Sequence, residues 1–430
     1  MKSPLMVRAV LWSIALSLIV NLVGCTVFGS KTENEVRAAT LPVPLKIYWI
    51  SDLSPFGDET VVFHPIEYAY PLIGDNEIYV GVSDGCFFCI RRSDGSVKWK
   101  FRTFGGIEAS PVANDQMVFI GDVDGQIYAI SRDDGSAIWT YRVQGEVLGK
   151  ISVANDKIFA ATDQGRVYAF DTQTGKFLWM FKRAGALIEE QGFAPAGGSA
   201  AGFGMRHGSF TIHGIGSPVP YKDIVIAGFD DGYIIALGQN DGKERWKNLI
   251  TKAEGAIDVD ATPVFEDDKL YVPSYDSGMY CLNAENGTVL WSFLQEGGFS
   301  RVALDSSRIY FSSSGGRVIA LDKKNGQKIW STDIRLQDKR HSIAKGPRVQ
   351  LKVPTAPGLL RDTVIAGSSN GYLYVIDQKT GNIRWRFLPG YGLSSEIVSD
   401  KDQIFFLSNG GKLYSMGPYR YPQDSYFTSE

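Results

Sequence analysis

Residues 124–139 are DGQIYAISRDDGSAIW, and close copies of this stretch recur as far as the C-terminal region. Each copy begins with a turn that ends in glycine, continues with a short apolar run, and closes on a second turn four residues before a tryptophan. A period of about 40 residues is typical of propellers and solenoids. The glycines that precede the apolar runs are Gly85, Gly125, Gly165, Gly232, Gly278, Gly316, Gly371 and Gly411.

The apolar runs, such as IYAI at residues 127–130, predict strands rather than helices, because they are short and rich in β-branched and aromatic residues. They are apolar on both faces, as expected where a sheet packs against other sheets on either side. Pairs such as Asp134-Gly135 suit hairpin turns. A further strand precedes each run, and starts such as Ser110-Pro111-Val112 come before several of these. The repeat therefore predicts four-stranded antiparallel blades.

The number of blades follows from the tryptophans. Eight glycine-led strands stand against seven Gly-x-x-x-Trp units. We predict that Trp49 is the eighth tryptophan and that the N-terminal strand around it completes the last blade, which leaves no terminal blade with an open edge. The predicted fold is an all-β, eight-bladed β-propeller closed by its N-terminal strand. Each tryptophan is expected on an outermost strand, with its ring between neighbouring blades.

The N-terminal residues have the pattern of a processing segment. Lys2 and Arg8 supply positive charge, residues 9–20 are apolar, and LVGC at residues 22–25 matches the bacterial lipobox. The match predicts that Cys25 is diacylated; the alternative is a secretory signal with an incidental cysteine. No later stretch is long and apolar enough to span a bilayer. The predicted organisation is a signal peptide at 1–24, a flexible tether at 25–44 and one propeller at 45–430.

Charge and cysteine usage narrow the functional classes. A net charge of −3 argues against a nucleic-acid partner. Cys86 and Cys89 are three residues apart on a predicted strand, which places their side chains on opposite faces and about 10 Å apart, too far for a disulfide. No histidine follows Cys89, so the pattern does not support haem attachment. With Cys281, these residues are interpreted as small core residues rather than a redox or metal motif.

Two stretches depart from the repeat. The interval between Trp179 and Trp246 is about 27 residues longer than the period and includes a Gly- and Ala-rich segment at 192–216. A second insert, at 331–357, carries a basic run that is interpreted as a solvated loop rather than an anion site. Insertions of this kind fall on loops, which often bind partners.

The repeats resemble pyrroloquinoline-quinone-type propeller repeats. With the lipobox, the eight units and the N-terminal tryptophan strand, they are similar to the BamB family of lipoproteins of the outer-membrane β-barrel assembly (BAM) machinery. Two segments carry the resemblance further. FTIHG at 210–214 stands where the family has an apolar-x-apolar-Arg-Gly stretch, and DVDATPV at 258–264 matches its Asp-Val-Asp-x-Thr-Pro stretch. The resemblance covers essentially the whole mature chain and implies that these two neighbouring loops bind a periplasmic POTRA domain of BamA, the barrel-forming subunit.

Carried over to this sequence, the resemblance implies that Phe210 and Ile212 are apolar anchors, and that Asp258 and Asp260 face basic POTRA residues. His213 stands in place of the family's arginine, and a neutral imidazole cannot make the permanently charged, bidentate contact of that residue. Either the partner has co-adapted or this contact is weaker here. The residues also allow structural roles: the aspartates capping the loop before the strand at 262–265, and the two apolar residues packing the insert on the ring.

The function implied by the resemblance is a non-catalytic scaffold in the outer membrane. It would be lipid-anchored, face the periplasm, need no cofactor, and help unfolded outer-membrane protein clients to fold and insert. One possible mode is β-augmentation, in which an exposed strand edge receives an extended client segment. The sequence does not say which clients depend on it.

The alternatives are a quinoprotein dehydrogenase dependent on pyrroloquinoline quinone (PQQ), and another periplasmic ligand-binding propeller. A dehydrogenase needs a cofactor pocket, usually with Ca²⁺ bound by oxygen ligands, and a general base. The chain has no vicinal cysteine pair, Walker loop or Gly-x-Ser-x-Gly motif, and no metal-ligand spacing among its four histidines. The tryptophan recurs in every blade, which is typical of packing rather than of stacking on one cofactor. We therefore predict that the chain is not an enzyme and binds no metal.

Overall fold

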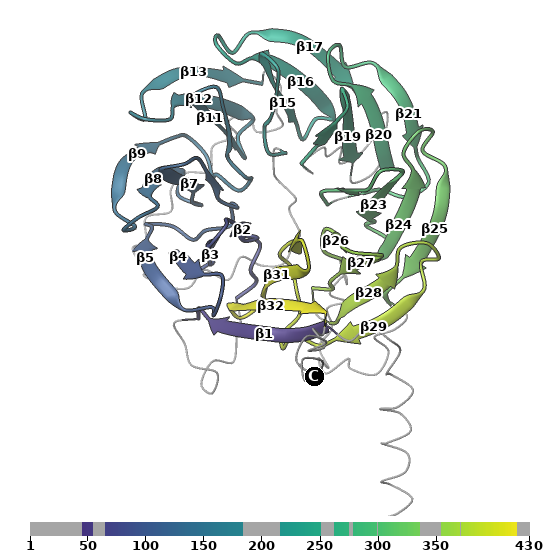
Figure 1. The fold of residues 1–430 in the computed structure, drawn as a ribbon. Coiled ribbons are helices and arrows are strands. Elements are labelled where there is room, and N and C mark those ends of the chain that lie inside the picture. The colour runs from purple at the N-terminus through teal and green to yellow at the C-terminus, as the bar shows by residue number, and fades with distance from the viewer. Residues whose placement is uncertain are drawn as a thin grey trace, which may run out of the picture. The chain divides into compact units, whose positions relative to one another are not determined.

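The structure, a computed structural model, describes residues 45–54, 65–183, 216–250, 262–274, 278–298, 300–335, 354–369 and 371–418. Almost all of them belong to one compact unit, Lys46–Gly417. Within this unit, eight four-stranded sheets are arranged around a ring (Figure 1). The predicted all-β, eight-bladed propeller is confirmed.

Each blade is one antiparallel sheet whose first strand is innermost and whose fourth is outermost (Figure 1). The strands of blades 1 to 4 are β2 (Leu72–Ile73), β3 (Glu77–Gly81), β4 (Cys86–Arg91), β5 (Val97–Arg102); β6 (Val112–Ala113), β7 (Met117–Gly121), β8 (Gln126–Ser131), β9 (Ala137–Arg142); β10 (Ser152–Ala154), β11 (Lys157–Thr162), β12 (Arg166–Asp171), β13 (Phe177–Lys182); and β14 (Val219–Tyr221), β15 (Ile224–Gly228), β16 (Tyr233–Gly238), β17 (Glu244–Leu249). Those of blades 5 to 8 are β18 (Val264–Glu266), β19 (Lys269–Ser274), β20 (Gly278–Asn283), β21 (Val289–Phe293); β22 (Ala303–Leu304), β23 (Arg308–Ser312), β24 (Arg317–Asp322), β25 (Lys328–Asp333); β26 (Gly358–Leu360), β27 (Thr363–Ala366), β28 (Leu373–Asp377), β29 (Ile383–Phe387); and β30 (Val398–Asp400), β31 (Gln403–Ser408), β32 (Lys412–Pro418), β1 (Leu45–Asp52).

Blade 8 is built from both ends of the described chain. Its strands follow the order β1-β32-β31-β30, so the N-terminal strand is the outermost one (Figure 1). Just beyond β1, the Leu53 N–H donates to the Gly411 carbonyl at 2.9 Å. Closure of the ring by the N-terminal strand is therefore confirmed.

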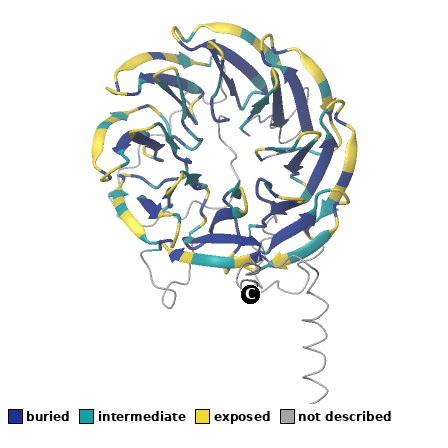
Figure 2. Cartoon of the chain, viewed as in Figure 1, coloured by how far each residue is buried: buried dark blue, intermediate teal, exposed yellow. Residues whose placement is uncertain are grey.

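The hydrophobic core lies between the blades. The middle strands are buried on both faces, whereas side chains of the outermost strands alternate between half-buried and exposed (Figure 2). One apolar cluster, for example, joins Phe119 and Ile127 of blade 2 to Ile158 and Phe170 of blade 3. Because each sheet packs against a neighbouring sheet on either side, its middle strands need apolar residues on both faces. This explains why the repeats lack the alternation typical of half-buried strands.

The recurrent tryptophan joins one blade to the next. Trp99 donates its Nε1–H to the Arg132 carbonyl at 3.0 Å, and its ring lies under Gly135. That glycine has φ +76°, and a Cβ there would meet the Trp99 ring at 2.7 Å, so both its backbone angle and its lack of a side chain are required. The tryptophan–glycine pairs are Trp49–Gly95, Trp99–Gly135, Trp139–Gly175, Trp179–Gly242, Trp246–Gly287, Trp291–Gly326 and Trp330–Gly381.

These pairs explain why the chain has eight blade tryptophans and seven glycine units. Trp49 on β1 of blade 8 packs on Gly95 of blade 1 and donates its Nε1–H to the Arg92 carbonyl at 3.0 Å. The prediction that it is the eighth tryptophan is confirmed. Trp385 of blade 7 stacks on Phe387, which contacts Tyr414 of blade 8. In blade 8, β32 and β1 come from opposite ends of the described chain. No hairpin turn joins these two strands, so no turn glycine is available to cover Trp385.

Two cysteines belong to the same packing scheme. In the strand register, Cys89 lies opposite Trp99 and Cys281 opposite Trp291, just as Ala129 lies opposite Trp139. Small residues are needed there because the tryptophan ring occupies the space. Both thiols are buried and free, and burial raises the pKa of each to about 11, so they are protonated at neutral pH.

Cys86 lies on the opposite face of β4 from Cys89. It packs against a cluster shared by blades 8 and 1, whereas Cys89 belongs to the cluster shared by blades 1 and 2. The Arg102 guanidinium donates to the Cys86 sulfur at 2.9 Å. The prediction that the two side chains lie on opposite faces of the strand is confirmed.

Candidate partner-binding site

The residues that the sequence assigns to function all lie outside the described part of the chain. They are Cys25, Phe210, Ile212, His213, Asp258 and Asp260. Their assignments to lipidation and partner binding therefore remain predictions. The structure does describe the residues on either side of two segments, 184–215 and 251–261, which contain the five predicted partner-binding residues.

Both segments end at one hydrogen-bonded point. Ser217 follows the first segment and Thr262 follows the second, and the Thr262 hydroxyl donates to the Ser217 hydroxyl at 3.0 Å. Ser217 is buried, and its Oγ also accepts the backbone N–H of Lys150 at 2.8 Å. The residue four positions after His213 is thus bonded to the residue two positions after Asp260.

Both segments also begin beside one turn, the β15–β16 turn of blade 4. Arg183 is the last described residue before the first segment, and its Nε lies 2.8 Å from Asp231 Oδ2 in a largely buried ion pair. Its guanidinium also stacks over the Tyr233 ring, 4.3 Å from the centroid. Ile250, the last described residue before the second segment, donates its N–H to the Gly232 carbonyl at 3.1 Å.

Blade 4 therefore fixes all four described ends of the two segments. Ser217 leads into β14, Thr262 is bonded to Ser217, and the two starting points contact the turn at residues 231–232. Sequence reasoning placed Thr262 in the stretch 258–264, but it did not identify the bond between Thr262 and Ser217 or the ion pair between Arg183 and Asp231. The pairing of these residues is set by the ring, because each pair comes from different blades or from opposite ends of one blade.

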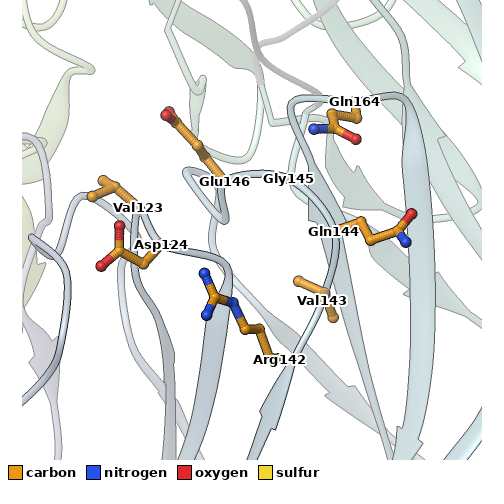
Figure 3. A pocket seen from close by; sticks show the side chains of 8 residues that line it. All are labelled: Val123, Asp124, Arg142, Val143, Gln144, Gly145, Glu146 and Gln164. Carbon is orange, nitrogen blue, oxygen red and sulfur yellow. The ribbon is translucent and has the colours of Figure 1, made fainter. Parts of the chain in front are cut away.

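A pocket of about 530 Å³ lies at the step between blades 2 and 3 (Figure 3). Its polar lining consists of Asp124, Arg142, Gln144, Glu146 and Gln164. Most of these side chains are exposed, and in the described part of the chain Arg142 forms no ion pair within 4 Å. One cation, two carboxylates and two amides around an open hollow suit a polar surface contact rather than the enclosure of a cofactor.

A buried carboxylate lies where blade 8 meets blade 1. Glu67 is 1% exposed, and its carboxylate accepts the N–H of Ser83 at 2.8 Å and the Ser83 hydroxyl at 3.1 Å. Its own N–H donates to Asn409 Oδ1 at 3.1 Å. Burial raises the pKa of Glu67 to about 7; the bonds from Ser83 oppose this shift, and the charges of Asp84 and Glu108 add to it. Sequence reasoning did not find this residue, because it precedes the first repeat.

Two further observations concern metals and membranes. Among the residues that the structure describes, no group of three or more His, Cys, Asp or Glu side chains is placed to hold a metal ion. The same residues include no helix long and apolar enough to cross a bilayer.

The fold places the chain among the eight-bladed propellers of pyrroloquinoline-quinone-type repeats. A family model described as outer membrane protein assembly factor BamB matches residues 46–186, 108–332 and 204–417. The chain belongs to this family.

Known relatives agree with this family. The outer membrane protein assembly factor BamB of Shewanella oneidensis is 24% identical over 218 residues, which cover 49% of this chain and 51% of the relative. The chain thus spans about half the length of the curated relatives it matches.

Solved structures agree with the fold. The crystal structure of BamB from Moraxella catarrhalis has a TM-score of 0.68 at 17% identity, covering 87% of this chain and 100% of that one. A quinohemoprotein alcohol dehydrogenase from Pseudomonas putida has a TM-score of 0.66 at 13% identity, covering 90% and 78%. At these identities, both likenesses concern the fold alone.

Proposed function

We propose that this protein is a non-catalytic scaffold of the outer-membrane β-barrel assembly machinery. In this proposal, Cys25 anchors it by lipid to the outer membrane, facing the periplasm, and it binds a POTRA domain of BamA while unfolded outer-membrane proteins fold and insert. Family membership over residues 46–417 supports this role. The dehydrogenase structures share only the fold, and fold by itself does not imply function.

The observation that carries the proposal is the convergence at blade 4. The segments that contain Phe210 and Asp258 are separated by a whole blade in sequence, yet their described ends are held together by the Thr262–Ser217 hydrogen bond and by the turn at residues 231–232. A scaffold that recognises one partner with two loops needs both loops to be fixed relative to each other, because ordering them at the moment of binding would reduce the affinity.

The test is a double charge reversal. Asp258→Arg with Asp260→Arg should abolish co-purification with BamA from detergent-solubilised envelopes, because like charges would then face the basic POTRA residues. The thermal unfolding midpoint should stay nearly unchanged. Asp115→Arg with Asp133→Arg makes the same change in charge on exposed positions of blade 2 and should retain the partner.

Two results would contradict the proposal. Unfolding of the Asp258/Asp260 variant would show that these aspartates are structural caps. Equal recovery of BamA with both double variants would show that the contact lies elsewhere on the ring.

A further inference from the structure

One register position recurs in all eight blades, two residues before the first strand. Because the first strands lie nearest the centre of the ring (Figure 1), the eight copies of this position surround its axis. Seven of the eight residues are polar. In blade order they are Tyr70, Ser110, Lys150, Ser217, Thr262, Arg301, Ala356 and Glu396.

The hydroxyl groups at this position hold neighbouring blades together. Ser110 Oγ accepts the Tyr70 N–H at 2.9 Å, which joins blade 2 to blade 1. Ser217 Oγ accepts the Lys150 N–H at 2.8 Å and the Thr262 hydroxyl at 3.0 Å, which joins blades 3, 4 and 5. These side chains are therefore occupied by the ring itself. The charged side chains at this position, those of Lys150, Arg301 and Glu396, take no part in these bonds.

Three charged side chains occupy this position, Lys150 in blade 3, Arg301 in blade 6 and Glu396 in blade 8. Arg301 Nη1 lies 3.7 Å from Glu396 Oε2. The Lys150 ammonium lies 5.8 Å from the centroid of the Tyr70 ring and has no carboxylate within 4 Å among the residues that the structure describes. Burial, and then the charge of Arg301, lower the pKa of Lys150, whereas Glu396 raises it. The three groups are thus within electrostatic reach of one another.

Among the eight residues of this register position, the charges do not balance, since two cations stand against one carboxylate. A half-buried ammonium without a counter-ion is unfavourable, and an anion that accepts its hydrogen bonds removes the penalty. The Arg301 side chain is 43% exposed, so small solutes reach it. Next to it in the chain, Ser300 is 8% exposed and its hydroxyl has no hydrogen-bond partner among the described residues. Such an unsatisfied buried hydroxyl is uncommon.

We propose that Lys150 and Arg301 form an anion site on the propeller axis that takes a small monovalent carboxylate. One carboxylate brings the cluster to neutrality, because it offsets the single excess positive charge. A dianion would leave a negative excess beside Glu396. The ammonium and the guanidinium supply the donors that suit two carboxylate oxygens. The site joins residues from blades 3 and 6, and it does not depend on partner binding at blade 4.

The test is acetate binding to the purified protein, measured by saturation-transfer NMR at constant ionic strength. Wild type should bind acetate saturably, and Lys150→Met should weaken binding about tenfold, as expected for loss of one charge-assisted hydrogen bond. Glu396→Gln should strengthen binding, because it removes the competing carboxylate. Lys100→Met, on the exposed outermost strand of blade 1, serves as the matched control and should leave the affinity unchanged.

The two axial variants are expected to change acetate affinity in opposite directions, which distinguishes loss of the site from loss of structure. A general loss of structure weakens binding in both, whereas the proposed site requires a decrease for Lys150→Met and an increase for Glu396→Gln. Absence of saturable binding, or equal affinity of wild type and Lys150→Met, would overturn the site. Tighter binding of inorganic phosphate than of acetate, with the same dependence on Lys150, would overturn the assignment to a monovalent carboxylate.

Discussion

Substitution of Gly175 by alanine tests the packing of one blade on the next. Gly175 lies in the β12–β13 turn of blade 3 with φ +67°, and a Cβ there would lie 2.5 Å from Cδ2 of Trp139 on blade 2. The Trp139 ring cannot withdraw easily, because its Nε1–H is bonded to the Thr172 carbonyl at 2.9 Å and its other side faces Phe119. Two costs therefore add: a left-handed backbone and a steric clash.

The magnitude follows from these two costs. A residue with a Cβ in the left-handed region costs about 1–2 kcal/mol, and overpacking of a core contact costs about 1–3 kcal/mol. Gly175→Ala should therefore lower the free energy of unfolding by about 2–5 kcal/mol. Gly390 provides the matched control, since it has φ +74° but an added Cβ there would meet no heavy atom within 4 Å. Gly390→Ala should lose only the backbone part, about 1–2 kcal/mol.

The assay is equilibrium unfolding in guanidinium chloride, followed by far-UV circular dichroism for wild type and both variants. Two more variants, Trp139→Leu alone and Trp139→Leu with Gly175→Ala, complete a double-mutant cycle in which the smaller side chain relieves the clash. The cost of Gly175→Ala should be smaller in the leucine background, which appears as a coupling energy. Equal losses for Gly175→Ala and Gly390→Ala would refute the reasoning, because the tryptophan ring would then make no difference.

Two further predictions concern the junction where the ring closes. Trp49→Phe removes the hydrogen bond to the Arg92 carbonyl and should cost about 1 kcal/mol more in chemical denaturation than Trp291→Phe, because the buried Trp291 N–H has no partner among the described residues. Similar losses would contradict this. Glu67 has a folded-state pKa of about 7, above the ordinary range for a glutamate, so the folded state binds the proton more tightly. Its contribution to stability is fully present below the unfolded pKa and is lost as pH rises through 7. Glu67→Gln should therefore gain stability relative to wild type between pH 5 and pH 8, and a constant difference over this range would argue against the shifted pKa.

The form of the blade and the number of blades could be predicted from the sequence. These predictions rest on local features: the strand pattern, the turn glycines and the tryptophan four residues later. The contacts of each feature form within one hairpin or between adjacent blades. Trp49 could be recognised as the missing eighth tryptophan because the other seven define what the position requires. The same logic explains Cys89 and Cys281, which stand where other blades have alanine beneath a tryptophan ring.

The site was predictable only in part. Phe210, Ile212, His213, Asp258 and Asp260 came from resemblance to a family, and their placement lies outside the described residues. The ion pair between Arg183 and Asp231 was missed, because the two residues are 48 positions apart and lie in different blades. An ion pair between two blades leaves no periodic trace in the sequence.

The contacts made across the ring depend on its closure and could not be predicted from the repeat. Closure brings β1 beside β32, so no hairpin turn joins them, and none of the described glycines packs on Trp385. It also places Lys150, Arg301 and Glu396 around one axis, although each is an isolated charge in its own repeat. The physical reason is that hairpins form between neighbours in the chain, whereas an axis is shared by all eight blades and exists only once the ring has closed.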